Sequence, residues 1–405
     1  MHMPFDTHNL RPKRIALFSG NYNYVMDGPV RALNKLVEYL EKQGIEVLVF
    51  APTAKEAAFR HKGTLVSVPS VCLPGRRSEY RLALGMPRRV KRQLEAFEPD
   101  LIHLAAPDIL GWRALSWAKK HGVPTVASFH TRFDTYPRYY HMAWLEKYVT
   151  ALMRKFYHRC EQVYVPSECM RTILKDQDMA KDLRIWSRGV DAQQFSPKRR
   201  DMDWRRSLGI ADDEIVISFV GRLVLEKGLG VFADTLDALK RRGVPYKALI
   251  VGAGPERDRF AEQLPEAIFT GYLQGDDLAR AYASSDIFFN ASITETFGNV
   301  TLEAMASGVP AVCADASGSR SLVTSGETGF LVEPGNIEAF ADKLSLLIED
   351  RPLHQAMANA SYETSKDITW DAVLGRLLEQ YGEAISKCPT RPWKQSTRPD
   401  FSAAE

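Results

Sequence analysis

The sequence lacks the cysteine pattern of a disulfide-stapled or zinc-binding protein. Its five cysteines are odd in number, lie far apart and include no C-x-x-C pair. Both kinds of site need paired or clustered cysteines, so we expect neither here. This pattern predicts a reducing, cytoplasmic environment and no metal site. The five residues are Cys72, Cys160, Cys169, Cys313 and Cys388.

Long apolar runs and a strong charge bias are also missing. No run reaches the roughly 18 apolar residues that a membrane span needs. The basic residues near the N-terminus are not followed by the apolar stretch of a secretory signal. The 53 Lys and Arg residues nearly balance the 50 Asp and Glu residues, so the net charge of +3 favours no class of partner. We therefore expect a cytoplasmic protein, with any membrane contact peripheral and on the cytoplasmic face.

What the sequence does contain is two rounds of alternating strand and helix patterns. Short apolar runs, which we read as strands, alternate with helical patterns, and the alternation restarts at 215–220. The runs include 14–20, 46–51, 101–104 and 162–165 before the restart, and 287–290 and 311–314 after it. This pattern predicts doubly wound parallel sheets, and 405 residues suffice for two domains. We expect an α/β fold with two Rossmann-like domains, at residues 1–195 and 196–368. We also expect a linker at 196–213, a final helix (369–387) packed back on the first domain, and a disordered tail at 388–405.

The segment 290–310 (NASITETFGNVTLEAMASGVP) follows a predicted strand and opens a helix. Gly298 lies at the start of that helix, and Glu295 and Glu303 lie eight residues apart. A helix N-terminus beside a glycine binds phosphate through its unpaired N–H groups. Glu295 in the loop is placed to hold sugar hydroxyls, and Glu303 in the helix to hold a ribose. The alternative is a helix-stabilising carboxylate together with an ordinary surface glutamate.

Three further segments follow other predicted strands. In 219–228 (FVGRLVLEKG), Arg222 and Lys227 follow Gly221 and would neutralise a departing diphosphate without a metal; the alternative is a solvated charged loop. In 250–255 (IVGAGP), two glycines permit close approach of a ligand, although the motif is not a full G-x-G-x-x-G. In 269–272 (FTGY), the backbone near Tyr272 would meet a nucleobase. The two glycines are Gly252 and Gly254.

Taken in order, the motifs GRxxxEKG, VGxGP, TGY and E-x7-E resemble the signature of glycosyltransferase family 4. The segments 128–137 (SFHTRFDTYP), 165–168 (VPSE) and 188–195 (RGVDAQQF) match as well, so the resemblance covers about residues 14–385. It implies the GT-B fold, in which two Rossmann-like domains face a cleft. It also implies a retaining, metal-independent transferase with no cofactor, whose UDP- or GDP-sugar donor is a substrate.

The resemblance also implies a role for individual residues. Arg222 and Lys227 would hold the diphosphate, Glu303 the ribose, and Glu295 the sugar. Because the motifs assign no carboxylate nucleophile, we expect displacement on the front face of the sugar. The first loop reads Asp27-Gly28-Pro29 where many members have Gly-Gly, which leaves its phosphate contacts open. Further implied contacts are Gly28 against the phosphates, His130 beneath the sugar near its anomeric carbon, and the backbone of Phe297, Gly298, Asn299 and Val300.

A basic segment at 76–92 interleaves cations with apolar residues and has Glu79 as its one acid. Such a segment can lie on an anionic membrane, although a solvated helix face is the usual meaning of a charge run. Nucleic acid is disfavoured because no recognition motif is present. The segments 21–36 and 129–140 also resemble lipid-directed mannosyl-, sulfoquinovosyl- and glucuronosyltransferases. We therefore predict a lipid acceptor (diacylglycerol, ceramide or glycolipid). The cations are Arg76, Arg77, Arg81, Arg88, Arg89, Lys91 and Arg92.

Four other functions stay open. A transferase for a soluble, polysaccharide or lipopolysaccharide acceptor would work without lipid. An epimerase of GT-B shape would convert a free sugar nucleotide, but its acid and base residues are not found at matching positions. A non-catalytic nucleotide-sugar binding module would have no need of the Arg222 and Lys227 pair. A phosphorylase would carry pyridoxal phosphate and its absorbance band.

Overall fold

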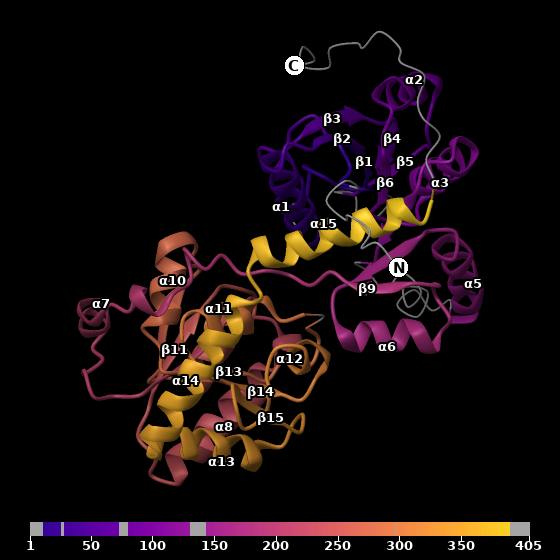
Figure 1. Cartoon of the computed structure of the whole chain (residues 1–405). Coiled ribbons are helices and arrows are strands. Elements are labelled where there is room, and N and C mark those ends of the chain that lie inside the picture. Colours follow the sequence, from indigo (N-terminus) through magenta and orange to yellow (C-terminus); the bar gives the residue numbers. More distant parts are fainter. Residues whose placement is uncertain (1–10, 26–27, 73–79, 130–142, 296, 389–405) are drawn as a thin grey trace, which may run out of the picture. The chain divides into compact units, whose positions relative to one another are not determined.

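The computed structural model contains two compact α/β units (Figure 1). Unit 1 comprises residues 1–186 and 374–405, and unit 2 comprises residues 187–373. The structure describes residues 11–25, 28–72, 80–129, 143–295 and 297–388. The expected disordered tail therefore lies, apart from Cys388, outside the described residues.

Unit 1 is built on a seven-stranded parallel sheet with the order β3-β2-β1-β6-β7-β8-β9. The order reverses direction between β1 and β6, as in a doubly wound sheet. A separate antiparallel hairpin joins β4 (Ser70–Cys72) to β5 (Arg81–Ala83). The sheet strands are β1 (Arg14–Phe18), β2 (Glu46–Ala51), β3 (Thr64–Ser67), β6 (Leu101–Leu104), β7 (Thr125–Ser128), β8 (Gln162–Val165) and β9 (Leu183–Ile185). The helices are α1 (Gly28–Lys42), α2 (Arg88–Phe97), α3 (Ile109–His121), η4 (Ala143–Leu145), α5 (Glu146–Tyr157), α6 (Glu168–Asp176) and α15 (Trp370–Ser386).

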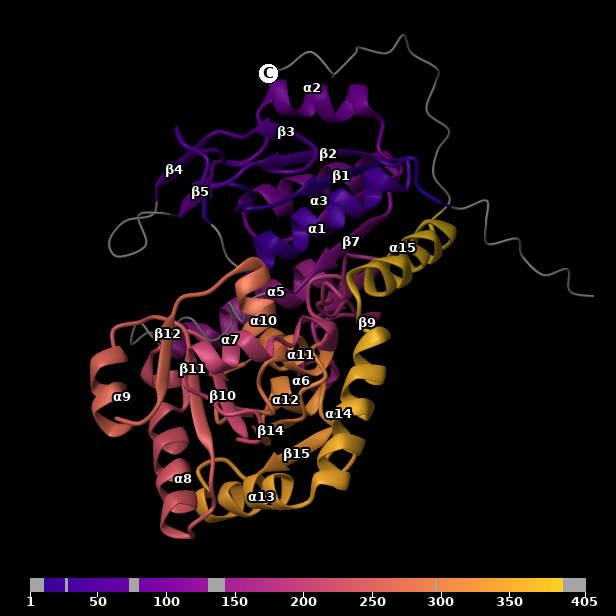
Figure 2. The same cartoon turned by 90° about the vertical axis from the view of Figure 1, so that its left-hand side faces the viewer.

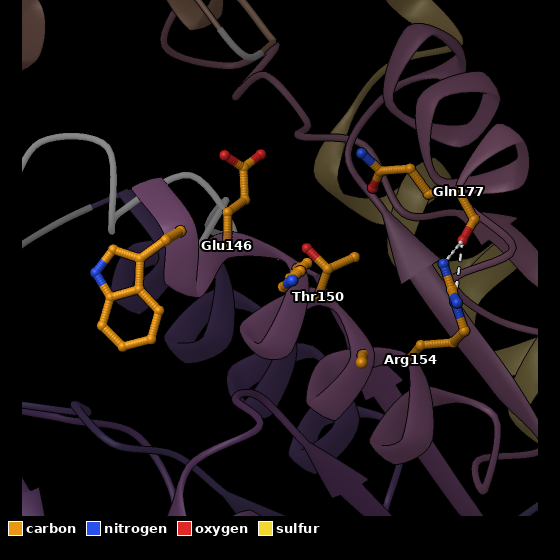
Figure 3. A pocket seen from close by; sticks show the side chains of 7 residues that line it. Glu146, Thr150, Arg154 and Gln177 are labelled. Carbon is orange, nitrogen blue, oxygen red and sulfur yellow. Dashed lines mark hydrogen bonds between the residues drawn. The ribbon is translucent and has the colours of Figure 1, made fainter. Parts of the chain in front are cut away.

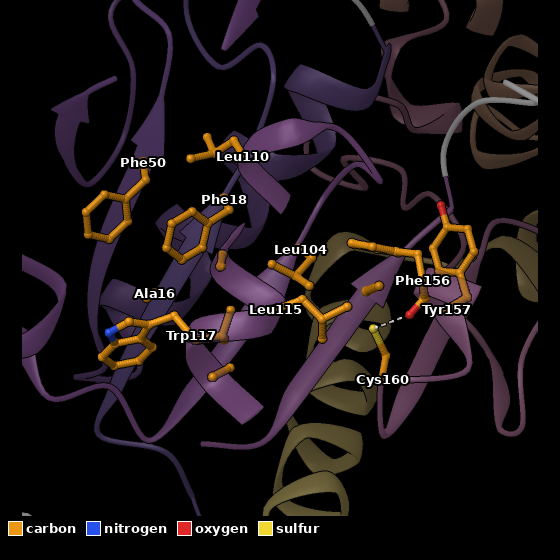
Figure 4. Packing of buried hydrophobic residues seen from close by; sticks show 14 of the residues in the cluster. Ala16, Phe18, Phe50, Leu104, Leu110, Leu115, Trp117, Phe156, Tyr157 and Cys160 are labelled. Carbon is orange, nitrogen blue, oxygen red and sulfur yellow. Dashed lines mark hydrogen bonds between the residues drawn. The ribbon is translucent and has the colours of Figure 1, made fainter. Parts of the chain in front are cut away.

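The core of unit 1 lies between the sheet and a layer of helices. Strands β6, β7 and β8 are buried along their whole length, because helices cover both faces of a parallel sheet. The rings of Phe18 and Phe50 stack with centroids 4.6 Å apart on neighbouring strands. Figure 4 shows these rings with Trp117 from α3 and Phe156 from α5, all in one apolar cluster.

The last helix, α15, belongs to unit 1 from residue 374 onward and is joined to the sheet of that unit by a buried polar network. The hydroxyl of Tyr381 on α15 is 2.5 Å from Nδ1 of His103 on β6, and Nε2 of His103 is 3.0 Å from Oγ of Ser128. Burial lowers the pKa of His103 to about 3, so the imidazole is neutral at physiological pH. Both ring nitrogens therefore have hydrogen-bond partners inside the core.

Unit 2 is built on a six-stranded parallel sheet with the order β12-β11-β10-β13-β14-β15. The strand order reverses direction between β10 and β13. Helices α8 and α13 of this unit lie side by side (Figure 2). The strands are β10 (Val216–Val220), β11 (Lys247–Val251), β12 (Ile268–Gly271), β13 (Ile287–Asn290), β14 (Ala311–Ala314) and β15 (Gly329–Val332). The helices are η5 (Pro197–Arg199), α7 (Met202–Ser207), η6 (Leu225–Lys227), α8 (Leu229–Arg241), α9 (Arg257–Gln263), α10 (Gly275–Ala283), α11 (Asn299–Ala306), α12 (Ser317–Arg320), α13 (Ile337–Glu349) and α14 (Arg351–Lys366).

The stretch expected to be a linker, 196–213, is an integral part of unit 2. Arg205 on α7 is fully buried and donates to Oδ2 of Asp286 at 2.9 Å and to the carbonyl of Ser284 at 2.8 Å. Residues 187–195, which we expected in the first domain, belong to unit 2, where Val190 N–H donates to the carbonyl of Ile368. The linker interpretation was wrong because it rested on the many charged residues of this stretch. Charged residues occur in exposed linkers, but also in buried ion pairs such as the one here.

Candidate active site

The predicted site residues of unit 2 gather at the carboxyl edge of its sheet. Gly221 and Arg222 follow β10, Lys227 lies in η6, and Tyr272 follows β12. Glu295 lies in the loop after β13, which leads into α11. The sheet reverses direction between β10 and β13, and doubly wound sheets bind ligands outside the carboxyl ends of their strands at such a point. The topology therefore brings the segments after these strands to one edge.

Lys227 and Glu295 form an ion pair that the sequence did not predict. Nζ of Lys227 is 2.5 Å from Oε1 of Glu295, and the two side chains are 27% and 19% exposed. Gly228, with φ of +73°, lets the turn approach the loop after β13, since a Cβ there would lie 2.7 Å from the carbonyl oxygen of Ala291. The pair is half-buried, so each group remains accessible to a charged or hydroxyl-bearing ligand.

Glu303 is held by a residue that the motifs did not single out. The hydroxyl of Tyr282 on α10 donates to Oε2 of Glu303 at 2.9 Å, and the tyrosine is fully buried. Burial, followed by the charge of Glu303, raises the pKa of Tyr282 well above its usual value, so the phenol stays protonated. A hydrogen bond from a neutral, buried donor fixes the carboxylate without neutralising it.

The N-terminus of α11 has the geometry expected of an anion site. Gly298 precedes the helix with φ of +92°, a conformation that suits glycine, and Asn299 is exposed. The first N–H groups of a helix have no partner within it. Phe297, just before the helix, is buried in the core of unit 2. Carboxyl-edge backbone donors therefore lie beside the half-buried Glu295.

Gly252 and Gly254, which we expected to let a ligand approach, also make room for a neighbouring loop. A Cβ on Gly252 would lie 1.9 Å from the carbonyl oxygen of Gly221, and one on Gly254 would lie 2.2 Å from that of Leu223. Leu223 N–H also donates to the carbonyl of Ala253 at 3.0 Å. These glycines therefore let the loops after β10 and β11 approach each other closely. They shape the segment that carries Arg222.

Two neighbours of Glu295 gave no signal in the sequence. Ser317 Oγ donates to the backbone carbonyl of Glu295 at 3.1 Å. A Cβ on Gly318 would lie 2.7 Å from Cβ of Glu295, so the glycine makes room for this side chain. Both belong to α12, which follows β14. Their role depends on tertiary contact, and no spacing in the SGSR segment indicates it.

The remaining predicted residues are more scattered. Arg222 and Tyr272 are exposed on unit 2, and Gly28 is the exposed first residue of α1 in unit 1. Arg81 lies on strand β5, whereas four cations are exposed on α2, so the basic segment is not one continuous helix. His130, Arg76 and Arg77 lie outside the described residues. The four cations are Arg88, Arg89, Lys91 and Arg92.

Unit 1 has a half-buried carboxyl group at the carboxyl edge of its own sheet. Asp108 follows β6 and caps α3, where Oδ1 accepts from the N–H of Gly111 at 2.7 Å. Burial raises its pKa to about 6, and the backbone hydrogen bonds oppose this shift. A carboxyl group with this pKa beside a sheet reversal is a candidate contact for a polar ligand. No motif in the sequence singled it out, because Asp108 reads as an ordinary helix cap.

Two further kinds of site are absent from the described residues. No group of three or more His, Cys, Asp or Glu side chains among them is arranged to hold a metal ion. Within the same residues, no helix is long and apolar enough to cross a membrane.

Comparison with known proteins places both units in one family. The sequence profile described as "Glycosyltransferase Family 4" matches residues 26–194, and "Glycosyl transferases group 1" matches residues 201–364. A GDP-mannose-dependent alpha-mannosyltransferase of Corynebacterium glutamicum is 32% identical over 93% of this chain and 90% of its own length. Sulfoquinovosyl transferase SQD2 of Arabidopsis thaliana is 32% identical over 93% of this chain and 74% of its own. An alpha-monoglucosyldiacylglycerol synthase of Streptococcus pneumoniae is 29% identical over 74% and 70%, respectively.

Solved structures share the fold at lower identity. Sucrose-phosphate synthase of Thermosynechococcus elongatus superposes with a TM-score of 0.71 at 19% identity, covering 93% of this chain and all of that one. Anabaena HepE, solved with UDP and glucose, gives 0.67 at 21% identity, covering 92% and 100%. The two doubly wound sheets, the profiles and the relatives agree with the family expected from the motifs. The chain belongs to glycosyltransferase family 4, has the GT-B fold and is a hexosyltransferase.

Proposed function

We propose that the chain transfers a hexose or hexuronic acid from a UDP- or GDP-sugar to a membrane lipid, with retention of configuration and without a metal ion. The observation that carries the proposal is the Lys227–Glu295 pair beside the N-terminus of α11. It combines a cation for the diphosphate, a carboxylate for sugar hydroxyls and backbone N–H groups at one edge of a sheet. This set of groups suits a nucleoside diphosphate sugar.

The donor would be held by charge and by hydrogen bonds. Lys227 and the exposed Arg222 would hold the diphosphate, and Glu303, oriented by Tyr282, would accept the ribose hydroxyls. When a diphosphate engages Lys227, the carboxylate of Glu295 becomes available to the hydroxyls of the sugar. Relatives named for GDP-mannose and the HepE complex with UDP keep both nucleotides in consideration.

The reaction would be a front-face displacement. The bond between the anomeric carbon and the diphosphate oxygen breaks while the acceptor oxygen bonds to the same face of that carbon. The departing phosphate oxygen takes the acceptor proton, so no protein nucleophile is needed. The protein positions the groups and stabilises the charge that develops on the diphosphate. Arg222 and Lys227 are the residues with the charge for this role.

A lipid acceptor is supported by a relative and by a surface. The S. pneumoniae relative is named for monoglucosyldiacylglycerol, and α2 exposes four cations on unit 1. Basic residues near an anionic membrane are worth on the order of 1 kcal/mol each. A soluble saccharide acceptor is the second candidate, because Asp108 offers unit 1 a carboxyl contact for a polar acceptor.

The test is a donor panel in excess chelator. Purified protein is incubated with labelled UDP-glucose, UDP-glucuronate, UDP-galactose or GDP-mannose and with vesicles containing diacylglycerol or ceramide. Label from one donor should enter the organic phase, and the Lys227→Ala substitution should slow this transfer by roughly 10²–10³-fold. Nucleoside diphosphate release that requires a soluble saccharide would overturn the lipid acceptor. Transfer only after a divalent cation is restored would overturn metal independence.

A further inference from the structure

Helix α5 of unit 1 carries an exposed apolar stripe. Trp144, in the η4 turn that leads into the helix, is 66% exposed, Tyr148 is 58% exposed and Leu152 is 54% exposed. Their spacing of four residues places the three side chains one above another on one helix face. Single exposed apolar residues are common on protein surfaces, but an aligned set with two aromatic members indicates a contact surface.

The fold does not need this stripe. The opposite face of α5 holds the helix in place through Met153, Phe156 and Tyr157, which are buried in the core of unit 1. The ring of Phe156 lies 5.2 Å from that of Trp112 on α3. Replacing the exposed residues therefore leaves the packing of the helix intact, so a variant reports on contact rather than on folding.

The stripe has a basic border and a hollow beside it. A hollow of about 660 Å³ is lined by Trp144, Lys147 and Arg154, among others. Figure 3 shows side chains around it, with Arg154 turned toward Gln177. The guanidinium of Arg154 donates to the backbone carbonyl of Gln177 at 2.8 Å from one nitrogen and 3.2 Å from another, which fixes this side of the hollow. Lys147 and Lys155 are exposed, so α5 carries three cations against the single acid Glu146.

Helices α2, α3 and α5 form one layer of unit 1. Nε1 of Trp117 on α3 donates to Glu95 on α2 at 3.5 Å, and α3 contacts α5 through Trp112 and Phe156. Helices in a parallel α/β sheet run opposite to the strands, so all three begin near the carboxyl edge. The exposed cations that open α2, Arg88 and Arg89, therefore share a layer and an edge with Trp144.

We propose that this stripe (Trp144, Tyr148 and Leu152) docks in the headgroup region of an anionic lipid bilayer. Trp and Tyr favour the membrane interface because one part of each ring is apolar and the other is polar. The cations of α5 and α2 complement the negative charge of the lipid surface. The inference rests on the proposed function, since a lipid acceptor has to be reached at a membrane, and it identifies the residues that make the contact.

The test measures vesicle binding of the full chain by flotation. Vesicles are phosphatidylcholine alone or with phosphatidylglycerol as the anionic lipid. The triple variant Trp144→Ser, Tyr148→Ser, Leu152→Ser should lose roughly tenfold in bound fraction on anionic vesicles. Leu346→Ser, which removes an exposed leucine from unit 2, is the matched control and should bind like the original protein. Vesicle binding by the triple variant equal to that of the original overturns the proposal.

A second readout places Trp144 itself in the bilayer. Brominated lipids should quench part of the tryptophan fluorescence of the original protein, and Trp144→Phe should remove that part while vesicle binding persists. Unchanged quenching in this variant would overturn the inference. So would a triple variant that dissociates an oligomer but still binds vesicles.

Transfer of the sugar to a short-chain acceptor in detergent separates the membrane-docking proposal from the proposed function. The triple variant should retain this transfer activity. If the original protein itself shows no such activity, the result would count against the proposed function alone.

Discussion

At the scale of single residues, Lys227 and Arg222 differ in environment but share an expected role. Lys227 is paired with Glu295, whereas Arg222 is exposed at the end of β10. We predict that Lys227→Ala and Arg222→Ala each lower kcat by roughly 10²–10³-fold, because each removes a contact that strengthens as the diphosphate departs. Unfolding free energies should change by no more than about 1 kcal/mol. Steady-state kinetics measure kcat, and denaturant titrations measure the free energy of unfolding. Nearly full activity in either variant would contradict the assignment of these residues to the diphosphate.

Tyr282 tests the orientation of Glu303 without removing its charge. Tyr282→Phe deletes the hydroxyl that donates to Oε2 of Glu303 but keeps the buried ring. We predict a donor KM raised by roughly 5–30-fold, since hydrogen bonds to charged groups contribute about 1–2 kcal/mol, with a smaller change in kcat. Ser285→Ala, on a buried hydroxyl that donates to the carbonyl of Ala281, is the control for a general loss of stability. If the two variants changed KM equally, the result would argue against a role of the Tyr282 hydroxyl in orienting Glu303.

Asp108 should give unit 1 a measurable pH dependence. Its pKa is about 6 in the folded chain, against an ordinary value of 3.8. The folded state therefore binds the proton more tightly than the unfolded state, and stability falls as pH rises from about 4 through 6. The pH-dependent loss of stability across that range is on the order of 3 kcal/mol. Asp108→Asn keeps a good helix cap and should remove this loss. Urea titrations of both proteins at pH 4 and pH 7 measure the difference, and parallel pH profiles would contradict it.

At the scale of elements, the strands that were predicted best are the buried ones. Runs such as 101–104, 162–165, 287–290 and 311–314 match β6, β8, β13 and β14, because central parallel strands are continuous apolar runs. Strands β3, β9 and β15 were missed: β3 and β9 are only partly buried, and β15 begins at a glycine. Strand β4 was missed, and β5 was read as part of the basic segment 76–92, because each of these strands is only three residues long.

The glycines of unit 2 differ in the space that they leave for a Cβ atom, and two alanine variants can test this difference. Gly252 has φ of +150° and no room for a Cβ, since the Gly221 carbonyl oxygen would lie 1.9 Å away. We predict that Gly252→Ala destabilises the chain by more than about 2 kcal/mol. Gly230 on α8 has open space around it, so Gly230→Ala should stabilise by up to about 1 kcal/mol. Thermal unfolding compares them, and a tolerated Gly252→Ala would contradict the loop packing.

At the scale of the whole molecule, the motifs predicted the family and the sheet edge, but not how the residues engage one another. The spacing of Glu295 and Glu303 indicated a donor site, whereas the pairing of Glu295 with Lys227 depends on the fold bringing η6 to the loop after β13. Tyr282, Ser317 and Gly318 lie on other elements, so no local pattern joins them to the site. Arg205 shows the same limit, because burial beside Asp286 cannot be read from composition.

The measurement that tests the central claim most directly is nucleotide binding to the full chain in excess EDTA. UDP and GDP are titrated calorimetrically into the original protein and into Glu303→Gln. If the carboxyl edge of unit 2 is the donor site, one of the two nucleotides binds with one site per chain without a metal. Glu303→Gln then weakens it by roughly 10–100-fold, because a charged hydrogen bond to the ribose is lost. Binding of neither nucleotide, or equal affinity in both proteins, would contradict the account.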